Sequence, residues 1–176
     1  MKRNALISVY DKSEIKKICN IFDRFNIGII STGATAKKII SLGYKCKEIS
    51  SLTKFKEVLD GRVKTLHPKL HASILFKRNN PKHQKTFNKL NFPTIDFVIV
   101  NFYPFTKILN KEVTEKKIEM IDIGGPSMIR SASKNFASVT TICDKKFYDP
   151  FIKEMIKNKG ITSLSFRKKL QKKILN

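Results

Sequence analysis

The chain has 176 residues, of which 41% are hydrophobic and 28% are charged, so it can bury the core of about one globular domain and is too apolar to be disordered. Its net charge is +22, which favours a phosphorylated substrate. The basic residues are spread over every segment, so we interpret them as a solvated surface and do not expect nucleic acid as a partner.

The amino-terminal segment and the cysteines exclude two further classes. The apolar run that follows Lys2 and Arg3 stops at Tyr10 and Asp11, which is too short for a signal peptide or a membrane span. Three cysteines lie far apart and are odd in number, which predicts reduced thiols and no disulfide framework: Cys19, Cys46 and Cys143. We therefore expect a cytoplasmic protein.

The first part of the chain alternates strand and helix patterns. Residues 5–10 form a short apolar run that is typical of a buried parallel strand. Apolar residues then recur at helical spacing over residues 15–25, with Asp11 or Ser13 as the cap. We expect a second strand at 28–31, a turn at 32–35, a short helix that ends at Gly43 and a third strand at 44–49.

The second part continues the alternation and predicts the fold class. Strands are expected at 97–102 and 138–143, and helices at 55–59, 81–90, 112–120, 126–135 and 148–157. Residues 163–175 read as one basic amphipathic helix with no obvious place in the sheet. Strands that alternate with helices predict an α/β protein with a mostly parallel, twisted sheet.

Polar loops follow the first two strands. Ligands of open parallel sheets bind beyond the carboxyl ends of the strands, and SVYDK (8–12) and STGAT (31–35) fall there. Hydroxyls and free N–H groups at a helix start can bind an anion. By itself, this pattern is more typical of a well-capped strand–helix turn than of an anion site.

Three more loops carry charged or polar residues that no apolar periodicity explains. GRVKTLHP (61–68) supplies two cations and a hydroxyl, IDIGGP (121–126) supplies a carboxylate and two glycines, and NFYP (101–104) ends a strand. Together with Lys134 and Asn135, we expect these loops to converge on one edge of the sheet.

His67 and His71 lie four residues apart, a spacing that can bind a metal. We expect no metal site, because no third ligand is placed and Pro68 interrupts the first turn.

These motifs support a resemblance to a known family. SVYDK (8–12), STGATA (31–36), DGRVKTLHPKLHASIL (60–75), NFYPF (101–105) and IDIGGPSMIRSASKN (121–135) resemble the IMP cyclohydrolase domain that forms the N-terminal part of the bifunctional AICAR transformylase/IMP cyclohydrolase. The resemblance runs from about residue 4 to about residue 170 and places the chain in the methylglyoxal-synthase-like fold group.

The resemblance implies a three-layer α/β/α fold and the last step of de novo purine biosynthesis. In that step, 5-formamidoimidazole-4-carboxamide ribotide (FAICAR) closes to IMP with loss of water, without a metal or another cofactor. It also implies a homodimer, a domain over residues 1–160 and a basic helix at 161–176 that leads toward a transformylase domain absent from the chain. Whether the chain is part of a longer enzyme or stands alone is left open.

The family's functional residues carry over to matching positions. Lys134 matches the proton donor/acceptor, and Lys64, Tyr103 and Asp122 match the other residues held to act in cyclisation. Substrate contacts are implied at Tyr10, Asp11, Lys12, Thr32, Gly33, Ala34, Thr35, Arg62, Val63, Thr65, Val100, Asn101, Ile123, Gly124 and Gly125.

Three places depart from the family pattern, and one of them is Ala72-Ser73, which replaces a small glycine pair. Tyr10 stands where Ser is frequent, so its ring could crowd the ribotide. Ala34 replaces a frequent Gly, and a positive φ there would cost roughly 1 kcal/mol.

Three other functions fit part of the pattern. A phosphate-sensing regulatory domain of the same fold group shares the STGATA turn, methylglyoxal synthase would need a differently placed aspartate, and nucleic-acid binding would use the +22 surface.

Overall fold

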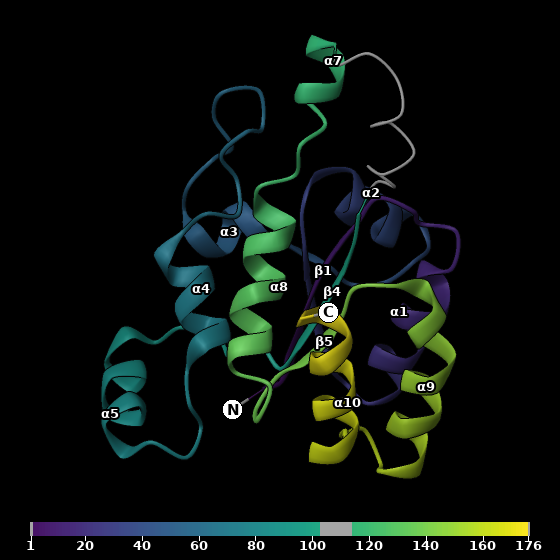
Figure 1. The fold of residues 1–176 in the computed structure, drawn as a ribbon. Coiled ribbons are helices and arrows are strands. Elements are labelled where there is room, and N and C mark those ends of the chain that lie inside the picture. The colour runs from purple at the N-terminus through teal and green to yellow at the C-terminus, as the bar shows by residue number, and fades with distance from the viewer. Residues whose placement is uncertain (1, 103–113, 176) are drawn as a thin grey trace.

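The computed structural model describes residues 2–102 and 114–175. Five parallel strands form one sheet in the order β3-β2-β1-β4-β5. Strands β1, β4 and β5 are labelled in Figure 1. The strands are β1 (Asn4–Val9), β2 (Gly28–Ser31), β3 (Lys47–Glu48), β4 (Phe97–Asn101) and β5 (Thr140–Ile142). The predicted α/β class with a parallel sheet is confirmed.

The helices cover both faces of this sheet (Figure 1). They are α1 (Ile15–Arg24), α2 (Gly33–Ser41), α3 (Ile49–Thr53), α4 (Pro68–Leu75), α5 (Pro81–Leu90), α7 (Glu115–Ile118), α8 (Gly124–Lys134), α9 (Tyr148–Lys157) and α10 (Leu164–Leu175), with a short 3-10 helix at Lys145–Phe147. The predicted helices at 81–90 and 148–157 are found at these bounds.

The alternation of side chains along β1 produces two separate cores. Ala5, Ile7 and Val9 face the layer of α1, α2 and α9, whereas Leu6 faces the layer of α4 and α8. Successive strand residues point to opposite faces, so one apolar strand serves both layers. The result is the three-layer α/β/α arrangement.

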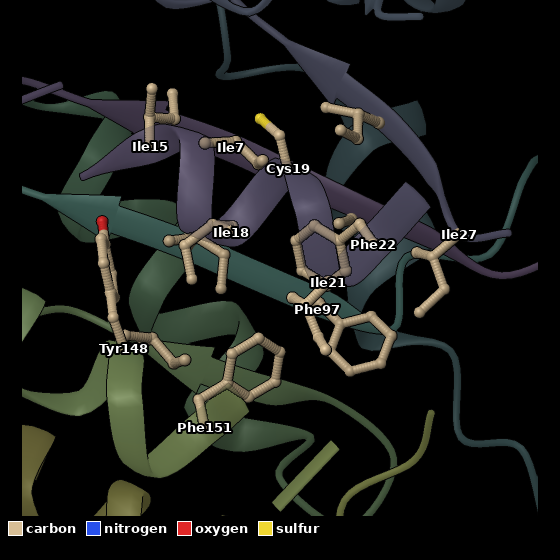
Figure 2. Packing of buried hydrophobic residues seen from close by; sticks show 14 of the residues in the cluster. Ile7, Ile15, Ile18, Cys19, Ile21, Phe22, Ile27, Phe97, Tyr148 and Phe151 are labelled. Carbon is tan, nitrogen blue, oxygen red and sulfur yellow. The ribbon is translucent and has the colours of Figure 1, made fainter. Parts of the chain in front are cut away.

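Aromatic rings organise the core under α1 and α9 (Figure 2). Phe22 of α1, Phe97 of β4 and Phe151 of α9 form a triangle with centroid separations of 5.2, 5.8 and 5.9 Å. Tilted and edge-on ring pairs at such separations add to the free energy of burial. The cluster fixes α1 and α9 relative to the sheet, and therefore the loops that precede both helices.

Some of the predicted elements are wrong or shortened. The strand expected at 44–49 reduces to Lys47–Glu48, and the helix expected at 55–59 is absent. Helix α3 instead ends at Thr53, because Lys54 adopts φ 59° in the left-handed region. A left-handed residue stops the run of helical hydrogen bonds.

Helix α4 was not predicted, since Pro68 was interpreted as an interruption. Pro68 is in fact the first residue of the helix, where a missing N–H costs nothing. His67 is the N-cap, and its Nδ1 accepts a hydrogen bond from Lys69 N at 3.1 Å. The proline therefore starts a helix that packs against α8.

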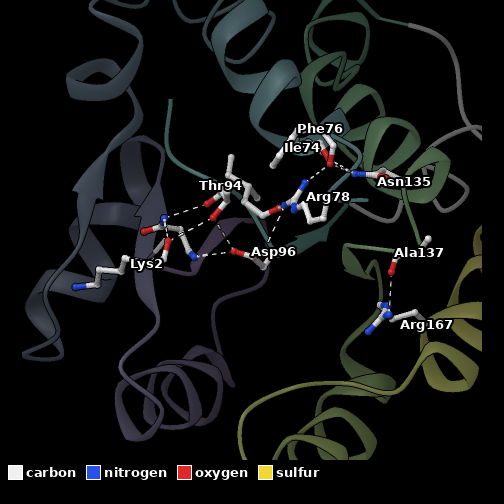
Figure 3. A network of polar contacts seen from close by, with 11 residues as sticks. Lys2, Ile74, Phe76, Arg78, Thr94, Asp96, Asn135, Ala137 and Arg167 are labelled. Carbon is white, nitrogen blue, oxygen red and sulfur yellow. Dashed lines mark hydrogen bonds and ion pairs between the residues drawn. The ribbon is translucent and has the colours of Figure 1, made fainter. Parts of the chain in front are cut away.

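The basic carboxyl-terminal helix packs on the domain. Leu170 of α10 is 3% exposed and Ile174 packs against the core on the α4 and α8 face. The Arg167 guanidinium donates to the carbonyl oxygen of Ala137 at 2.9 Å (Figure 3) and to that of Phe136 at 2.9 Å. The helix thus has a defined place beside β5, which the sequence pattern did not indicate.

A polar network closes the amino edge of the sheet (Figure 3). The Asp96 carboxylate accepts from Asn4 N and Thr94 Oγ1, each at 3.2 Å, and pairs with Arg78 at 3.4 Å. Arg78 also donates to Ile95 O at 2.8 Å. These donors and acceptors satisfy one another.

No helix among the described residues is long and apolar enough to cross a membrane. The three cysteines are free thiols, as predicted. Burial raises the pKa of the Cys19 thiol to about 12.

Candidate functional site

Two adjoining cavities lie at the carboxyl edge of the sheet. Their volumes are 530 and 330 Å³, and they share Ser8, Thr32, Lys64 and Asp122. These volumes fall in the range of small-molecule sites, and the place is where open parallel sheets bind ligands. We treat the two cavities as one site, called the rim cavity below.

The corner between β1 and α2 is tied together by hydroxyls. Thr35 Oγ1 donates to Val9 O at 3.1 Å and accepts from Val9 N at 3.3 Å, so this hydroxyl is used inside the protein. Ser31 Oγ donates to Ile7 O at 2.7 Å. These bonds hold the start of α2 against the end of β1.

The start of α2 is open toward the cavity. Among the described residues, no side chain caps this helix, and the first N–H groups of a helix have no partner within it. Gly33 has φ 43°, a left-handed value that suits glycine. The backbone strain expected at Ala34 does not arise, because the residue with a positive φ is Gly33 and not Ala34.

Asn101 holds the loop after β1. Its Oδ1 accepts from Asp11 N and its Nδ2 donates to Asp11 O, both at 2.9 Å. The Asp11 carboxylate in turn pairs with Lys145 at 2.6 Å, and hydrogen bonds from Lys145 and Ser13 lower its pKa. Asp11 and Asn101 therefore shape the loop that carries Tyr10 and Lys12.

The two glycines of IDIGG fit against side chains from other motifs. A Cβ on Gly124 would lie 2.0 Å from Thr65 Oγ1, and a Cβ on Gly125 would lie 2.2 Å from Asp122 Oδ2. Asp122 Oδ1 accepts from Gly125 N at 2.8 Å and so caps α8. A side chain at either glycine would collide with Thr65 or Asp122. Glycine at both positions therefore allows Thr65 and Asp122 to lie against the start of α8.

Residues 57–64 form a tight hairpin beside the cavity. Val58 and Val63 make an antiparallel bridge, and Leu59 and Asp60 both have φ 54° ahead of Gly61 at 88°. Left-handed conformations at Leu and Asp are costly and often occur at functional sites. We call this segment the rim hairpin.

Each of the two cations on the rim hairpin pairs with a glutamate. Lys64 Nζ lies 2.5 Å from Glu57 Oε2 across the base of the hairpin. The Arg62 guanidinium makes a two-pronged ion pair with Glu119, which follows α7. Arg62, Lys64 and Glu119 line the rim cavity, whereas Glu57 lies outside it. Both glutamates have lowered pKa values because they accept hydrogen bonds from these cations.

A buried histidine lies between α4 and α8. His71 Nδ1 is 2.9 Å from Ser131 Oγ, and its buried Nε2 has no hydrogen-bond partner among the described residues. Burial lowers the pKa of this ring. His67 packs against Phe55 instead, so the two histidines have separate environments.

The structure brings most of the implied site residues to the rim cavity and leaves others away from it. The residues that line it are Tyr10, Lys12, Thr32, Gly33, Ala34, Thr35, Arg62, Lys64, Thr65, Asn101, Asp122, Ile123, Gly124 and Gly125. Val100 is 1% exposed in the core, and Val63 forms the hairpin bridge. Tyr103 lies outside the described residues.

Lys134 is not at this edge. It is exposed at the last residue of α8, and a rise of 1.5 Å per residue puts it about 15 Å from Gly124 along the helix axis. The expectation that Lys134 joins the other loops is therefore wrong for its position, while its catalytic role stays a prediction.

Several lining residues were not predicted. They include Ser8, Asp60, Gly61, Glu119 and Met128. Glu57 was also missed, although the Asp60-Gly61 pair between Val58 and Val63 is a hairpin signal that would have placed Glu57 opposite Lys64.

No group of three His, Cys, Asp or Glu side chains within residues 2–102 and 114–175 is arranged to hold a metal ion. The chemical resources of the rim cavity include the cations Lys12, Arg62 and Lys64, the carboxylates Asp60, Glu119 and Asp122, hydroxyls and helix N–H groups. Such a set can bind an anionic, polar ligand and move a proton.

Fold and cavity together define a parallel α/β protein with an anion-directed site at the sheet edge. A family model described as "MGS-like domain" matches residues 14–127, which is more than half of the chain. The chain belongs to the MGS-like domain family.

Relatives and a solved structure agree with this assignment. The chain is 45% identical over its full length to the bifunctional purine biosynthesis protein PurH of Clostridium perfringens and 47% identical to that of Fusobacterium nucleatum. It spans 35% of each relative, so it corresponds to about a third of their length. The structure described as "Crystal structure of ForH" superposes with a TM-score of 0.86 at 26% identity, covering 99% of this chain and 92% of that one.

The resemblance found in the motifs is thereby confirmed at the level of the family and of purine biosynthesis relatives. The matched region includes the rim hairpin and the start of α8.

Proposed function

We propose that this chain is an IMP cyclohydrolase, which closes FAICAR to IMP with loss of water. The observation that carries the proposal is the close contact of Thr65 with Gly124 and of Asp122 with Gly125. These contacts lie beside Lys64, in a chain that matches bifunctional purine biosynthesis proteins. A cavity of this size and polarity suits a ribonucleoside monophosphate.

The reaction needs little covalent help from the protein. The carboxamide nitrogen attacks the formyl carbon of the same molecule, and a C–N bond forms. That nitrogen loses one proton and the former formyl oxygen gains one, which gives a hydroxyl. The hydroxyl then gains a second proton and leaves as water, while the formamide nitrogen loses its proton and a C=N bond forms in the ring. The site must hold the formyl group in the reactive rotamer and stabilise the developing charge.

The described residues supply these roles. The ribotide phosphate binds at the start of α2, with Lys12 nearby. Lys64 stabilises the oxyanion, and Asp122 accepts the proton from the carboxamide nitrogen while it caps α8.

Two roles from the resemblance remain part of the proposal. Tyr103 returns a proton to the leaving hydroxyl. Lys134 acts as proton donor/acceptor, although it lies at the far end of α8. Lys134→Ala tests it, because the resemblance predicts a loss of about 100-fold in turnover. A fully active variant would remove Lys134 from the mechanism.

We further propose a cytoplasmic homodimer that acts on a small-molecule nucleotide, with residues 1–160 as the catalytic domain and 161–176 leading toward a transformylase domain. Size-exclusion chromatography with light scattering checks the dimer; a single-copy mass at micromolar concentration contradicts it.

The activity has a direct test. Purified protein is given FAICAR with no folate present, and the absorbance of IMP is followed. Turnover that depends on Asp122 supports the proposal. Binding of FAICAR or IMP without any turnover would favour a phosphate-sensing regulatory domain instead.

A further inference from the structure

Lys64 occupies a position where positive charge accumulates. Its ammonium group lies 3.4 Å from the place that a Cβ on Gly33 would take, at the first residue of α2. The start of a helix carries a partial positive charge, so a cation beside it is unfavourable unless an anion lies between or beside them.

Lys64 is also the point where the cavities meet. A third cavity, of 610 Å³, adjoins the rim cavity on the side of Glu57 and Phe55. Among the described residues, only Lys64 lines all three cavities. Its side chain is 29% exposed, compared with 64% for that of Arg62.

Glu57 provides the missing anion. Its carboxylate lies 2.5 Å from Lys64 Nζ, and its own side chain is 56% exposed at the base of the rim hairpin. The hydrogen bond from Lys64 and the charges of Lys64 and Lys37 lower the pKa of Glu57, so it is ionised at neutral pH.

We infer that Glu57 is an internal counter-ion that occupies the anion position beside Lys64 in the free protein, and that the phosphate of the ligand competes with it. This inference deepens the proposed function, because it takes the start of α2 as the phosphate position. An ion pair this exposed is weak, so a phosphate dianion that also gains the helix N–H groups displaces it.

The competition has a measurable consequence. Without the Glu57 carboxylate, the cation and the helix start lack an anion until the ligand arrives. Glu57→Gln should therefore bind IMP and inorganic phosphate about five- to tenfold more tightly, because the phosphate no longer competes with a carboxylate for Lys64. Inosine, which lacks the phosphate, should bind with unchanged affinity.

The experiment is isothermal titration of IMP, inorganic phosphate and inosine into the purified chain at fixed ionic strength. Asp23→Asn is the matched control, because Asp23 is an exposed residue near the end of α1 and its loss changes the net charge equally. In a Lys64→Met background, Glu57→Gln should produce no further change. Glu57→Asp keeps the charge on a shorter side chain and should give an intermediate affinity.

Circular dichroism verifies that each variant folds. If Glu57→Gln does not fold, the phosphate affinity of Glu57→Asp is compared with that of wild type instead. Equal or weaker phosphate binding by Glu57→Gln than by Asp23→Asn overturns the inference, as does absence of phosphate binding in every variant. Tighter binding without FAICAR turnover supports the inference while it removes the proposed function. Turnover without tighter binding supports the proposed function and overturns the inference.

Discussion

The two ends of the sheet are both polar, but they use their polar groups differently. At the amino edge, Asp96, Arg78, Asn4 and Thr94 bond to one another and to nearby carbonyls (Figure 3). At the carboxyl edge, Lys64, Arg62 and the start of α2 face open cavities. A polar cluster that satisfies itself holds the fold together, whereas one that faces a cavity has bonding capacity left for a ligand.

This difference separates stability from activity. Changes at the amino edge should lower the free energy of unfolding and leave the chemistry intact. Changes in the rim cavity should lower turnover and leave the fold intact, except where a residue serves both purposes.

The largest effect is expected from the rim cavity. Lys64→Met removes the proposed oxyanion partner and should lower FAICAR turnover about 100-fold or more, because a single such group is worth that much in the transition state. The melting temperature should stay within a few degrees of wild type. Steady-state kinetics and calorimetry check both; a variant that keeps most of its turnover contradicts the role given to Lys64.

A residue that serves both purposes is Gly124. Gly124→Ala puts a methyl group 2.0 Å from Thr65 Oγ1, so the helix start or Thr65 must move. We expect a loss of about 1–3 kcal/mol in stability together with lower turnover. The double variant with Thr65→Ala makes room for the methyl group and should recover part of the stability. Chemical denaturation measures the stability of each variant. Equal stability of the single variant and wild type would contradict the close contact between Gly124 and Thr65.

The amino edge should show the opposite behaviour. Asp96→Asn turns an amide N–H₂ toward donors such as Asn4 N or Thr94 Oγ1 and removes the charge opposite Arg78. The expected cost is about 1–2 kcal/mol of stability, since a half-buried donor loses its acceptor. Turnover measured well below the melting temperature should be unchanged, and a large fall in turnover would erase the distinction between the two edges.

The smallest effect concerns His71, between the helices that join the two edges. Burial lowers its pKa below 6.5, so in acid the unfolded chain binds a proton that the folded chain does not. Stability contributed by the neutral ring is therefore present above pH 6.5 and declines as the pH falls below that value. Urea unfolding at pH 7.5 and 5.5 should show a larger loss for wild type than for His71→Gln. An equal loss of stability in both proteins would mean that His71 does not contribute to the pH dependence of stability.

The sequence by itself determined the elements whose signals are local. β2 and the helices at 81–90 and 148–157 follow from apolar runs and spacing, because burial of one face is recorded in the periodicity. The motifs also indicated which loops carry the polar groups of the rim cavity.

Only the tertiary structure decided which of these groups meet. That Glu57 pairs with Lys64, and that Thr65 requires Gly124, depends on how separate loops pack across the sheet edge. The position of Lys134 depends on the length of α8 between its two ends, which a match of motif letters does not convey. Periodicity records which face of an element is buried, but contacts between loops are set by the order of the strands and by the close packing of the side chains between them.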